Sequence, residues 1–246
     1  MIFFVTGGSR GIGAAIVLQA FAAGHDVAFT YRTDENSAHA IVEQAATSGR
    51  RVKYYQLDVR DSEAVERVGE QVADELGDVQ VVVNNAGVVR SNLAAMMTDD
   101  EWREVLDTNL SGAFYVCRAF LPTMLSTGFG RIINISSVVS GGMTGMANYA
   151  AAKAGLHGLT KSLAKEYGRK NITANCIVAG AVDTDMARHE LSEKVLRFGQ
   201  EFAPVPNGRL AAPQEIANIV TFLASEAANY INGAEISVTG GLDWLP

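Results

Sequence analysis

The sequence contains little that would support a disulfide framework, a metal site or a membrane span. Its two cysteines, Cys117 and Cys176, form no Cys-x-x-Cys pair, so we expect free thiols in a reducing compartment. Its four histidines are scattered without the spacing of metal ligands, so we expect no metal. No apolar run approaches the roughly 20 residues that span a bilayer, and the apolar start at residues 1–5 lacks the features of a signal peptide. These absences predict a cytoplasmic protein without a membrane partner.

Basic residues are also scarce. The chain has 20 lysines and arginines against 27 aspartates and glutamates, which gives a net charge of −7. Nucleic-acid-binding domains usually present a basic face, so this balance predicts no nucleic-acid partner. With 48% hydrophobic residues, the composition is that of a globular protein rather than a disordered one. The 246 residues lie near the upper limit for one hydrophobic core, and we predict one domain over residues 1–246.

Short β-rich runs alternate with helix-length stretches along the whole chain. We predict strands at residues 2–6, 27–31, 52–57, 79–83, 131–135, 172–178 and 235–238. We predict helices at residues 11–23, 36–47, 63–76, 112–125, 149–167, 213–224 and near 185–199, and one that begins at the capping box Thr98–Glu101. Strands separated by helices imply right-handed crossovers and a parallel sheet. The predicted class is therefore α/β, with one doubly wound seven-stranded parallel sheet and helices on both faces.

The least regular stretch lies between residues 185 and 210. It contains Pro204, Pro206 and Gly208 near its end. Long irregular segments in compact domains are usually functional, so we expect a lid over the site, with surface filler as the alternative.

A glycine-rich turn joins the first predicted strand to the first predicted helix. Residues 7–13 read Gly-Gly-Ser-Arg-Gly-Ile-Gly, a G-x-x-x-G-x-G spacing. Glycines here permit positive φ and let the backbone approach a pyrophosphate, while the helix N-terminus faces the anion. The turn therefore predicts dinucleotide binding; a turn that serves packing alone is the alternative.

The end of the second predicted strand indicates which dinucleotide is bound. An acidic residue there would bind the ribose 2′-hydroxyl and repel a 2′-phosphate. This chain instead has Tyr31 and Arg32, and Arg10 lies in the glycine turn. Two guanidinium groups suit a dianionic phosphate, so we predict NADP(H). Asp34 and Glu35 follow closely and keep NAD(H) as the alternative.

Three further motifs follow in order. They are Asn-Asn-Ala-Gly at residues 84–87, Tyr-Ala-Ala-Ala-Lys at 149–153 and Val-Thr-Gly-Gly at 238–241. With these motifs, essentially the whole chain resembles the short-chain dehydrogenase/reductase family, most of all its 3-oxoacyl-(acyl-carrier-protein) and acetoacetyl-CoA reductases. The resemblance implies a Rossmann-type fold and a homotetramer that packs through the long helices at about 99–125 and 149–167.

The resemblance also implies roles for individual residues. Asp58 would bind the adenine edge, Asn109 would complete a catalytic tetrad, and Thr184 would hold the nicotinamide carboxamide together with backbone groups near Val182. The full predicted cofactor set is Gly7, Ser9, Arg10, Gly11, Ile12, Gly13, Tyr31, Arg32, Asp58, Val59, Asn85, Ala86, Gly87, Tyr149, Lys153, Val182 and Thr184.

Tyr149 and Lys153 lie one helical turn apart on the same face of a predicted helix. A nearby ammonium favours phenolate, and so would the positive nicotinamide ring of an oxidised cofactor, so we expect the pKa of Tyr149 to be lowered from about 10. The phenol would then donate its proton to a carbonyl oxygen as hydride reaches the carbon. Lys153 would also bind the nicotinamide ribose, and Asn109 would hold a water against it. An ordinary amphipathic helix with a packed tyrosine and an exposed lysine is the alternative.

A serine hydroxyl would bind the same carbonyl oxygen and stabilise its developing charge. In close relatives the serine precedes the tyrosine by thirteen positions, which selects Ser136 here. The register of the preceding strand instead selects Ser137, with one residue deleted from the following loop. We predict Ser137 and keep Ser136 as the alternative.

The predicted activity is NADPH-dependent reduction of a 3-oxoacyl thioester, bound to a carrier protein or to CoA. An acidic carrier protein would need a local basic patch, for which Arg103, Arg169, Lys170 and Arg188 are candidates. The alternatives are a short-chain alcohol or sugar dehydrogenase, a ketoreductase of a secondary pathway, and a cofactor-binding regulator without catalysis. An intact Tyr/Lys pair argues against the regulator.

Overall fold

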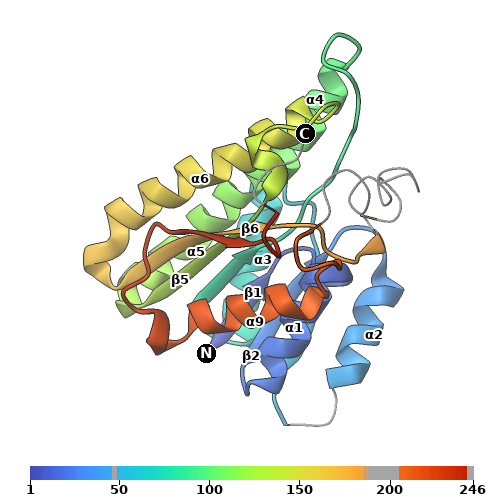
Figure 1. The fold of residues 1–246 in the computed structure, drawn as a ribbon. Helices are drawn as coiled ribbons and strands as arrows, with labels where there is room; N and C mark the ends of the chain where they lie inside the picture. The colour runs from blue at the N-terminus through green and yellow to red at the C-terminus, as the bar shows by residue number, and fades with distance from the viewer. Residues whose placement is uncertain (46–48, 186, 188–204, 243–246) are drawn as a thin grey trace.

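The computed structural model describes residues 1–45, 49–185, 187 and 205–242. Within these residues, seven strands form one parallel sheet in the order β3-β2-β1-β4-β5-β6-β7 (Figure 1). The strands are β1 (Ile2–Val5), β2 (Asp26–Tyr31), β3 (Val52–Gln56), β4 (Val81–Asn84), β5 (Gly130–Ser137), β6 (Ile172–Ala179) and β7 (Glu235–Val238). The predicted doubly wound sheet is thus confirmed. The strand order reverses between β1 and β4, and this switch point opens a crevice at the carboxyl ends of the strands.

Helices cover both faces of the sheet (Figure 1). One layer contains α1 (Gly11–Ala22), α2 (Glu35–Ala45) and α9 (Pro213–Ala224), whose apolar sides meet one buried cluster with β1 and β2. The other contains α3 (Ser62–Glu75), α5 (Gly112–Thr127) and α6 (Ala147–Tyr167), which bury a second cluster on the opposite face. The central strands are buried on both faces, which explains their continuous apolar runs.

Most predicted elements form within one or two residues of their expected bounds. The fourth strand is the clearest difference, because it begins at Val81 rather than at Val79. Val79 is buried, but Gln80 is bonded through its backbone and its side chain to Ile2 before the ladder with β1 begins. The helix expected near 185–199 and most of the expected lid lie outside the described residues.

The long helix expected at about 99–125 has an irregular centre. It begins as α4 (Asp99–Leu106), behind the predicted capping box of Thr98 and Glu101, which is confirmed. It then passes through a π-helical stretch, Asp107–Ser111, before α5 continues it. Such π-helical insertions often occur at functional sites.

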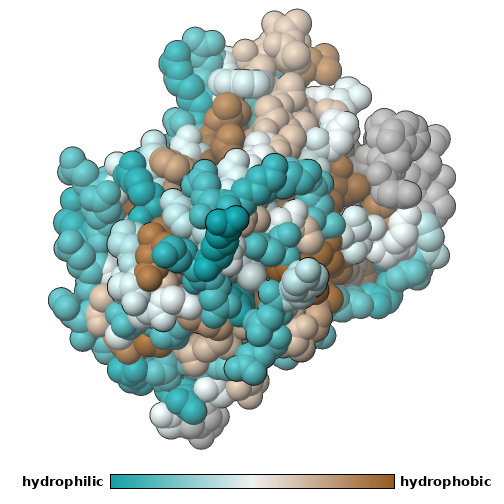
Figure 2. Space-filling model, turned by 90° about the vertical axis from the view of Figure 1, so that its left-hand side faces the viewer, coloured by the Kyte–Doolittle hydropathy of each residue, from teal (hydrophilic) through white to brown (hydrophobic). Residues whose placement is uncertain are grey.

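The surface where α6 ends, on the left of Figure 1, is mostly hydrophilic. Figure 2 shows teal and white residues over most of this face, with brown, apolar residues in separate patches. Within the described residues, no helix combines the length and the apolar character needed to cross a membrane.

Candidate cofactor and catalytic site

A cavity of about 370 Å³ lies at the carboxyl ends of the strands, on both sides of the switch point between β1 and β4. Every predicted site residue in the catalytic and cofactor sets lines it except Asn109. The cavity joins two regions that are far apart in the sequence, the glycine turn before α1 and the start of α6. One elongated ligand can therefore contact both.

The glycine turn is held by hydrogen bonds from neighbouring strands. Gly7 has a φ of 65°, and its N–H donates to Thr30 Oγ1 at 3.3 Å. The Asn85 side chain donates to Thr6 O at 2.9 Å and to Gly7 O at 3.1 Å. A Cβ at residue 13 would lie 2.1 Å from Gly7 O, so only glycine fits there. Asn85 therefore fixes the shape of the turn in addition to lining the cavity.

The first turn of α1 is open toward this cavity. No side chain caps the helix, and no acidic residue lies in its first turn. Gly11, Ile12 and Gly13 at its start all line the cavity. Backbone N–H groups at a helix N-terminus form a ready anion site, and here they face the space beside the turn.

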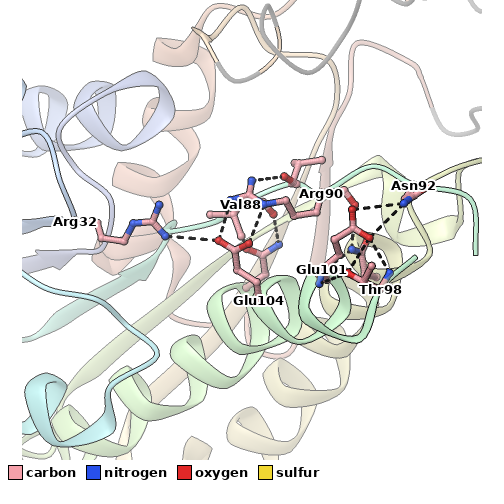
Figure 3. Close-up of polar contacts among 10 residues, drawn as sticks. Arg32, Val88, Arg90, Asn92, Thr98, Glu101 and Glu104 are labelled. Carbon is pink, nitrogen blue, oxygen red and sulfur yellow. Dashed lines mark hydrogen bonds and ion pairs between the residues drawn. The ribbon is translucent and has the colours of Figure 1, made fainter. Parts of the chain in front are cut away.

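Arg10 and Arg32 both line the same end of the cavity. Arg32 Nη1 lies 3.9 Å from Glu104 Oε1, which projects from α4 across the crevice (Figure 3). Glu104 is held by two hydrogen bonds from Arg90, from Nε and Nη2, each of 2.8 Å. Glu104 was not predicted, because nothing in the sequence places α4 beside the end of β2.

Asp58 lines the cavity beyond β3, but its carboxylate is already paired. Arg60 donates to it from Nε at 2.9 Å and from Nη2 at 2.5 Å. The hydrogen bond from Arg60 is the main reason that the pKa of Asp58 lies below its ordinary value. Asp58 is therefore ionised and paired with Arg60, a partner that was not predicted.

Tyr149 and Ser137 lie together in the middle of the cavity. Ser137 ends β5 in an extended conformation and lowers the pKa of Tyr149 by hydrogen bonding, although burial dominates and raises that pKa to about 12. The expected lowering of the phenol pKa is therefore not found in the protein alone. The Lys153 ammonium lies 5.5 Å from the centre of the Tyr149 ring, and burial of the phenol outweighs the hydrogen bond that opposes it.

The two candidate serines point in different directions, as adjacent residues of a strand do. Ser137 lies beside Tyr149, as the strand register predicts. Ser136 is 2% exposed, and its hydroxyl donates to Lys153 O at 3.0 Å rather than meeting the tyrosine. The structure thus brings Ser137, and not Ser136, to the phenol.

Lys153 is 4% exposed and is bound to β5. Its ammonium donates to Ile135 O at 2.8 Å. Burial lowers the pKa of Lys153 to about 8, because a charged amine loses its hydration in the interior. Thr184 and Val182 lie across the cavity after β6, and the Thr184 side chain lies close to Gly11.

Asn109 lies in the π-helical stretch behind the cavity wall. Both ends of its side-chain amide bind Val88, since Oδ1 accepts from Val88 N at 2.8 Å and Nδ2 donates to Val88 O at 2.9 Å. These two hydrogen bonds fix the backbone directly after Gly87. A Cβ added at Gly87 would lie 3.1 Å from Asn109 Oδ1.

The candidate residues of the basic patch that the structure describes do not come together. Arg103 is paired with Asp99 at 3.4 Å. Arg169 and Lys170 follow the C-terminal end of α6, about 30 Å along the helix from Tyr149 at its start. Arg188 lies outside the described residues. Within the described part of the chain, no group of histidine, cysteine or acidic residues could hold a metal ion.

Comparisons with known proteins agree with this geometry. A family model described as enoyl-(acyl carrier protein) reductase matches residues 7–243. The chain is 46% identical to the 3-oxoacyl-(acyl-carrier-protein) reductase FabG of Escherichia coli over 242 residues. The matched region covers 98% of this chain and 96% of that protein. It is 41% identical over 242 residues to the FabG of Staphylococcus aureus, with 97% and 96% covered.

A solved structure is similar over the whole chain. The crystal structure of a blue fluorescent protein from a metagenomic library, in complex with NADPH, has a TM-score of 0.90 and 38% identity, and covers 99% of this chain and 98% of its own.

Proposed function

This chain belongs to the short-chain dehydrogenase/reductase family, and we propose that it uses NADPH to reduce the 3-oxo group of an acyl thioester to a 3-hydroxyl group. The observation that carries the proposal is the convergence of Tyr149 and Ser137 in one cavity with the glycine turn. The curated relatives, which share more than two fifths of their residues with this chain, are 3-oxoacyl reductases.

The residues around the cavity fit a dinucleotide phosphate. The turn accommodates only glycine at residue 13, and the uncapped start of α1 offers N–H groups to a pyrophosphate. Arg10 and Arg32 would hold the 2′-phosphate, and Lys153 would bind the nicotinamide ribose. When bound, NADPH supplies the hydride for the carbonyl carbon.

The proton comes from Tyr149. Its pKa of about 12 keeps the phenol protonated, so it is a donor at neutral pH. Ser137 holds the same oxygen of the substrate and stabilises its developing negative charge. The pKa of Tyr149 would fall beside a positive charge such as that of an oxidised nicotinamide, and a lower pKa favours proton donation from the phenol.

Lys153 orients the reacting groups and does not itself contact the substrate. Its ammonium is bound to Ile135 O on β5, next to the two serines. The side chain of Asn109 binds Val88, and its second N–H and second lone pair remain for the water that we assign to it.

An apolar wall beside Tyr149 suits an acyl chain. Val89, Val139 and Met146 form a buried cluster there, with Met143 packed against it. All four line the cavity. Methionine side chains adapt to different shapes, so this wall is expected to accept acyl chains of several lengths.

Reduction of a carbon–carbon double bond, named in the description of the matching family model, fits the site less well. The Tyr149 and Ser137 hydroxyls are adjacent and can share one oxygen acceptor. A ketone provides that oxygen on the carbon that receives hydride, whereas saturation of a double bond delivers the proton to carbon.

Two broader features belong to the same proposal. We place the enzyme in the cytoplasm, since its two cysteines are free thiols, as expected in a reducing compartment. We also propose a homotetramer of single-domain subunits, supported by exposed apolar side chains on α4 and α5.

The direct test follows the absorbance of NADPH mixed with the protein and acetoacetyl-CoA. We expect oxidation of NADPH with this substrate and with longer 3-oxoacyl thioesters, and none with crotonyl-CoA. Binding without any oxidation, in the presence of a series of 3-oxoacyl thioesters, would remove the proposal. Preference for crotonyl-CoA would favour the double-bond reaction.

Tyr149→Phe tests the proton donor. The variant keeps the ring and loses the hydroxyl, so we expect kcat to fall by about a hundredfold or more while NADPH affinity changes little. NADPH binding is measured by its fluorescence and turnover by its absorbance. Ser136→Ala, measured alongside, is expected to retain far more activity than Ser137→Ala. Undiminished turnover in Tyr149→Phe would refute the role.

A further inference from the structure

A chain of hydrogen-bonding side chains runs from Lys153 and Ser136, at the wall of the cofactor cavity, to the protein surface. Ser136 Oγ donates to Lys153 O at 3.0 Å and lies 2.9 Å from His157 Nε2. His157 Nδ1 lies 3.0 Å from Glu235 Oε2. The other oxygen of Glu235 lies 2.5 Å from Lys161 Nζ. Residues from β5, α6 and β7 are thereby joined in one line.

Exposure rises along this line. Ser136 is 2% exposed, the side chain of His157 is 19% exposed and that of Glu235 is 32% exposed. The titratable and charged groups around the imidazole are Lys153 and Lys161 on its own helix, Glu235 on β7, and the buried Cys176 on β6, which packs against Ser136. The inner end is buried and the outer end meets solvent, so a proton can reach the ring without passing through the cavity.

The order serine, histidine, carboxylate is that of a nucleophilic triad, but the geometry excludes that function. The Ser136 hydroxyl is buried and its proton is directed at Lys153 O. A nucleophile has to reach a substrate atom, and it is the next residue of β5, Ser137, that meets Tyr149. The chain therefore acts on Lys153 and not on a substrate.

The protons along this line of hydrogen bonds can be arranged in two ways. Ser136 has a single proton, which it gives to Lys153 O, so its oxygen accepts from His157 Nε2–H. The carboxylate of Glu235 accepts from Nδ1–H. This arrangement is complete only when both ring nitrogens carry protons. A neutral ring that keeps its proton on Nδ1 offers a lone pair at Nε2, and Ser136 then turns its proton to the ring and releases Lys153 O.

We propose that His157 and Glu235 are positioning residues for Lys153, and that the protonation of the His157 ring decides whether Ser136 holds the Lys153 carbonyl. Two hydrogen bonds join Lys153 to β5. Its ammonium donates to Ile135 O, and its carbonyl accepts from Ser136 Oγ. Loss of the hydrogen bond from Ser136 loosens the attachment to β5 of the helical turn that carries the ammonium. The inference rests on the proposed function, in which Lys153 orients the reacting groups.

The pH dependence of kcat/KM tests this inference. Reduction of acetoacetyl-CoA with saturating NADPH is followed from about pH 5.5 to about pH 9, the range in which an imidazole titrates. We expect kcat/KM of the wild type to fall about fivefold as the ring loses its second proton, the effect of one hydrogen bond. His157→Gln keeps a donor near Nε2 and cannot ionise, so this step disappears from its profile.

Two further variants complete the design. Glu235→Gln replaces the carboxylate that faces Nδ1 of the ring, and we expect the step of the wild-type profile to change. His39→Gln is the matched control, since His39 is an exposed histidine that pairs with Glu43 on α2. We expect its profile to match that of the wild type. An unchanged profile in His157→Gln overturns the inference, and so does an equal change in His39→Gln.

A measurement without turnover separates this inference from the proposed function. Nitrogen resonances of the histidine rings are followed by nuclear magnetic resonance across the same pH range. We expect the titration of His157 to change in Ser136→Ala and in Glu235→Gln, and to stay unchanged in His39→Gln. A wild type that reduces no thioester removes the proposed function, and the ring titration then decides on the hydrogen-bond chain. A titration of His157 that is identical in all the variants overturns the inference.

Discussion

Within the described part of the chain, no carboxylate pairs with the buried ammonium of Lys153, and its burial has a cost in stability. Burial lowers its pKa from 10.5 to about 8. Between these values the unfolded chain binds more protons than the folded one, so the free energy of unfolding rises with pH across the interval. Below about pH 8 the lysine is charged in both states and the full penalty of burial is present. The raised pKa of Tyr149 works in the opposite direction above about pH 10, where the unfolded phenol ionises first.

We therefore expect Lys153→Met to be more stable than the wild type at neutral pH while losing activity. The gain is about 2 kcal/mol, the desolvation penalty less the lost hydrogen bond to Ile135 O. Urea unfolding at several pH values measures it, and the rise in stability between about pH 8 and about pH 10 should flatten in the variant. The control Lys165→Met removes an exposed lysine from the same helix and should leave the slope unchanged. A variant that is less stable at neutral pH would contradict this account.

At the scale of secondary-structure elements, the phosphate end of the cavity depends on the approach of α4 to the end of β2. Arg32 lies 3.9 Å from Glu104, so the cation expected to select NADPH already faces a carboxylate in the free protein (Figure 3). A 2′-phosphate has to compete with Glu104 for this guanidinium. Arg90 holds Glu104 with two hydrogen bonds and thereby weakens the competition.

Two substitutions at this contact should change cofactor preference in opposite directions. Arg32→Ala is expected to raise the KM for NADPH about tenfold or more and to leave the KM for NADH nearly unchanged, since only NADPH carries the 2′-phosphate. Glu104→Gln is expected to lower the KM for NADPH about threefold, because the carboxylate no longer competes. Both effects should shrink as salt is added. Arg50→Ala, at an exposed arginine, is the control. Equal losses for both cofactors in Arg32→Ala would contradict this role for Arg32.

Local sequence predicts some of these features and misses others. The strands were predicted because central parallel strands need continuous apolar runs, and the glycine turn because its backbone permits no side chain at residue 13. Strand alternation separated Ser137 from Ser136 for the same local reason. The π-helical stretch was not predicted, since one extra residue in a helical turn leaves no periodic signal. The Arg32–Glu104 contact and the Ser136–His157–Glu235 chain join residues 21 or more apart through the fold, and no spacing rule predicts them.

At the scale of the whole molecule, apolar side chains remain exposed on two separate parts of the surface. Trp102, Phe114 and Leu125 are 39%, 44% and 39% exposed on α4 and α5. Phe222 on α9 is 44% exposed, and Tyr230, just before β7, is fully exposed. A tetramer with three perpendicular two-fold axes needs at least two different self-complementary surfaces, and a dimer needs only one. Two separate apolar surfaces therefore favour the tetramer.

Phe114→Asp should stop the assembly at the dimer. The charge would be buried without a partner if α4 and α5 pack against their symmetry mates, so that interface fails while the one around Phe222 remains. Light scattering of the wild type should give about four times the subunit mass of 26.2 kDa, and that of the variant about twice it. Leu93→Asp places the same charge on an exposed leucine in the loop before α4 and serves as the control, with the wild-type mass expected. Because each subunit contains a complete cavity, the dimeric variant should still bind NADPH. A wild type that is monomeric at micromolar concentration, or a Phe114→Asp variant that stays tetrameric, would show that the exposed face of α4 and α5 is not a subunit interface.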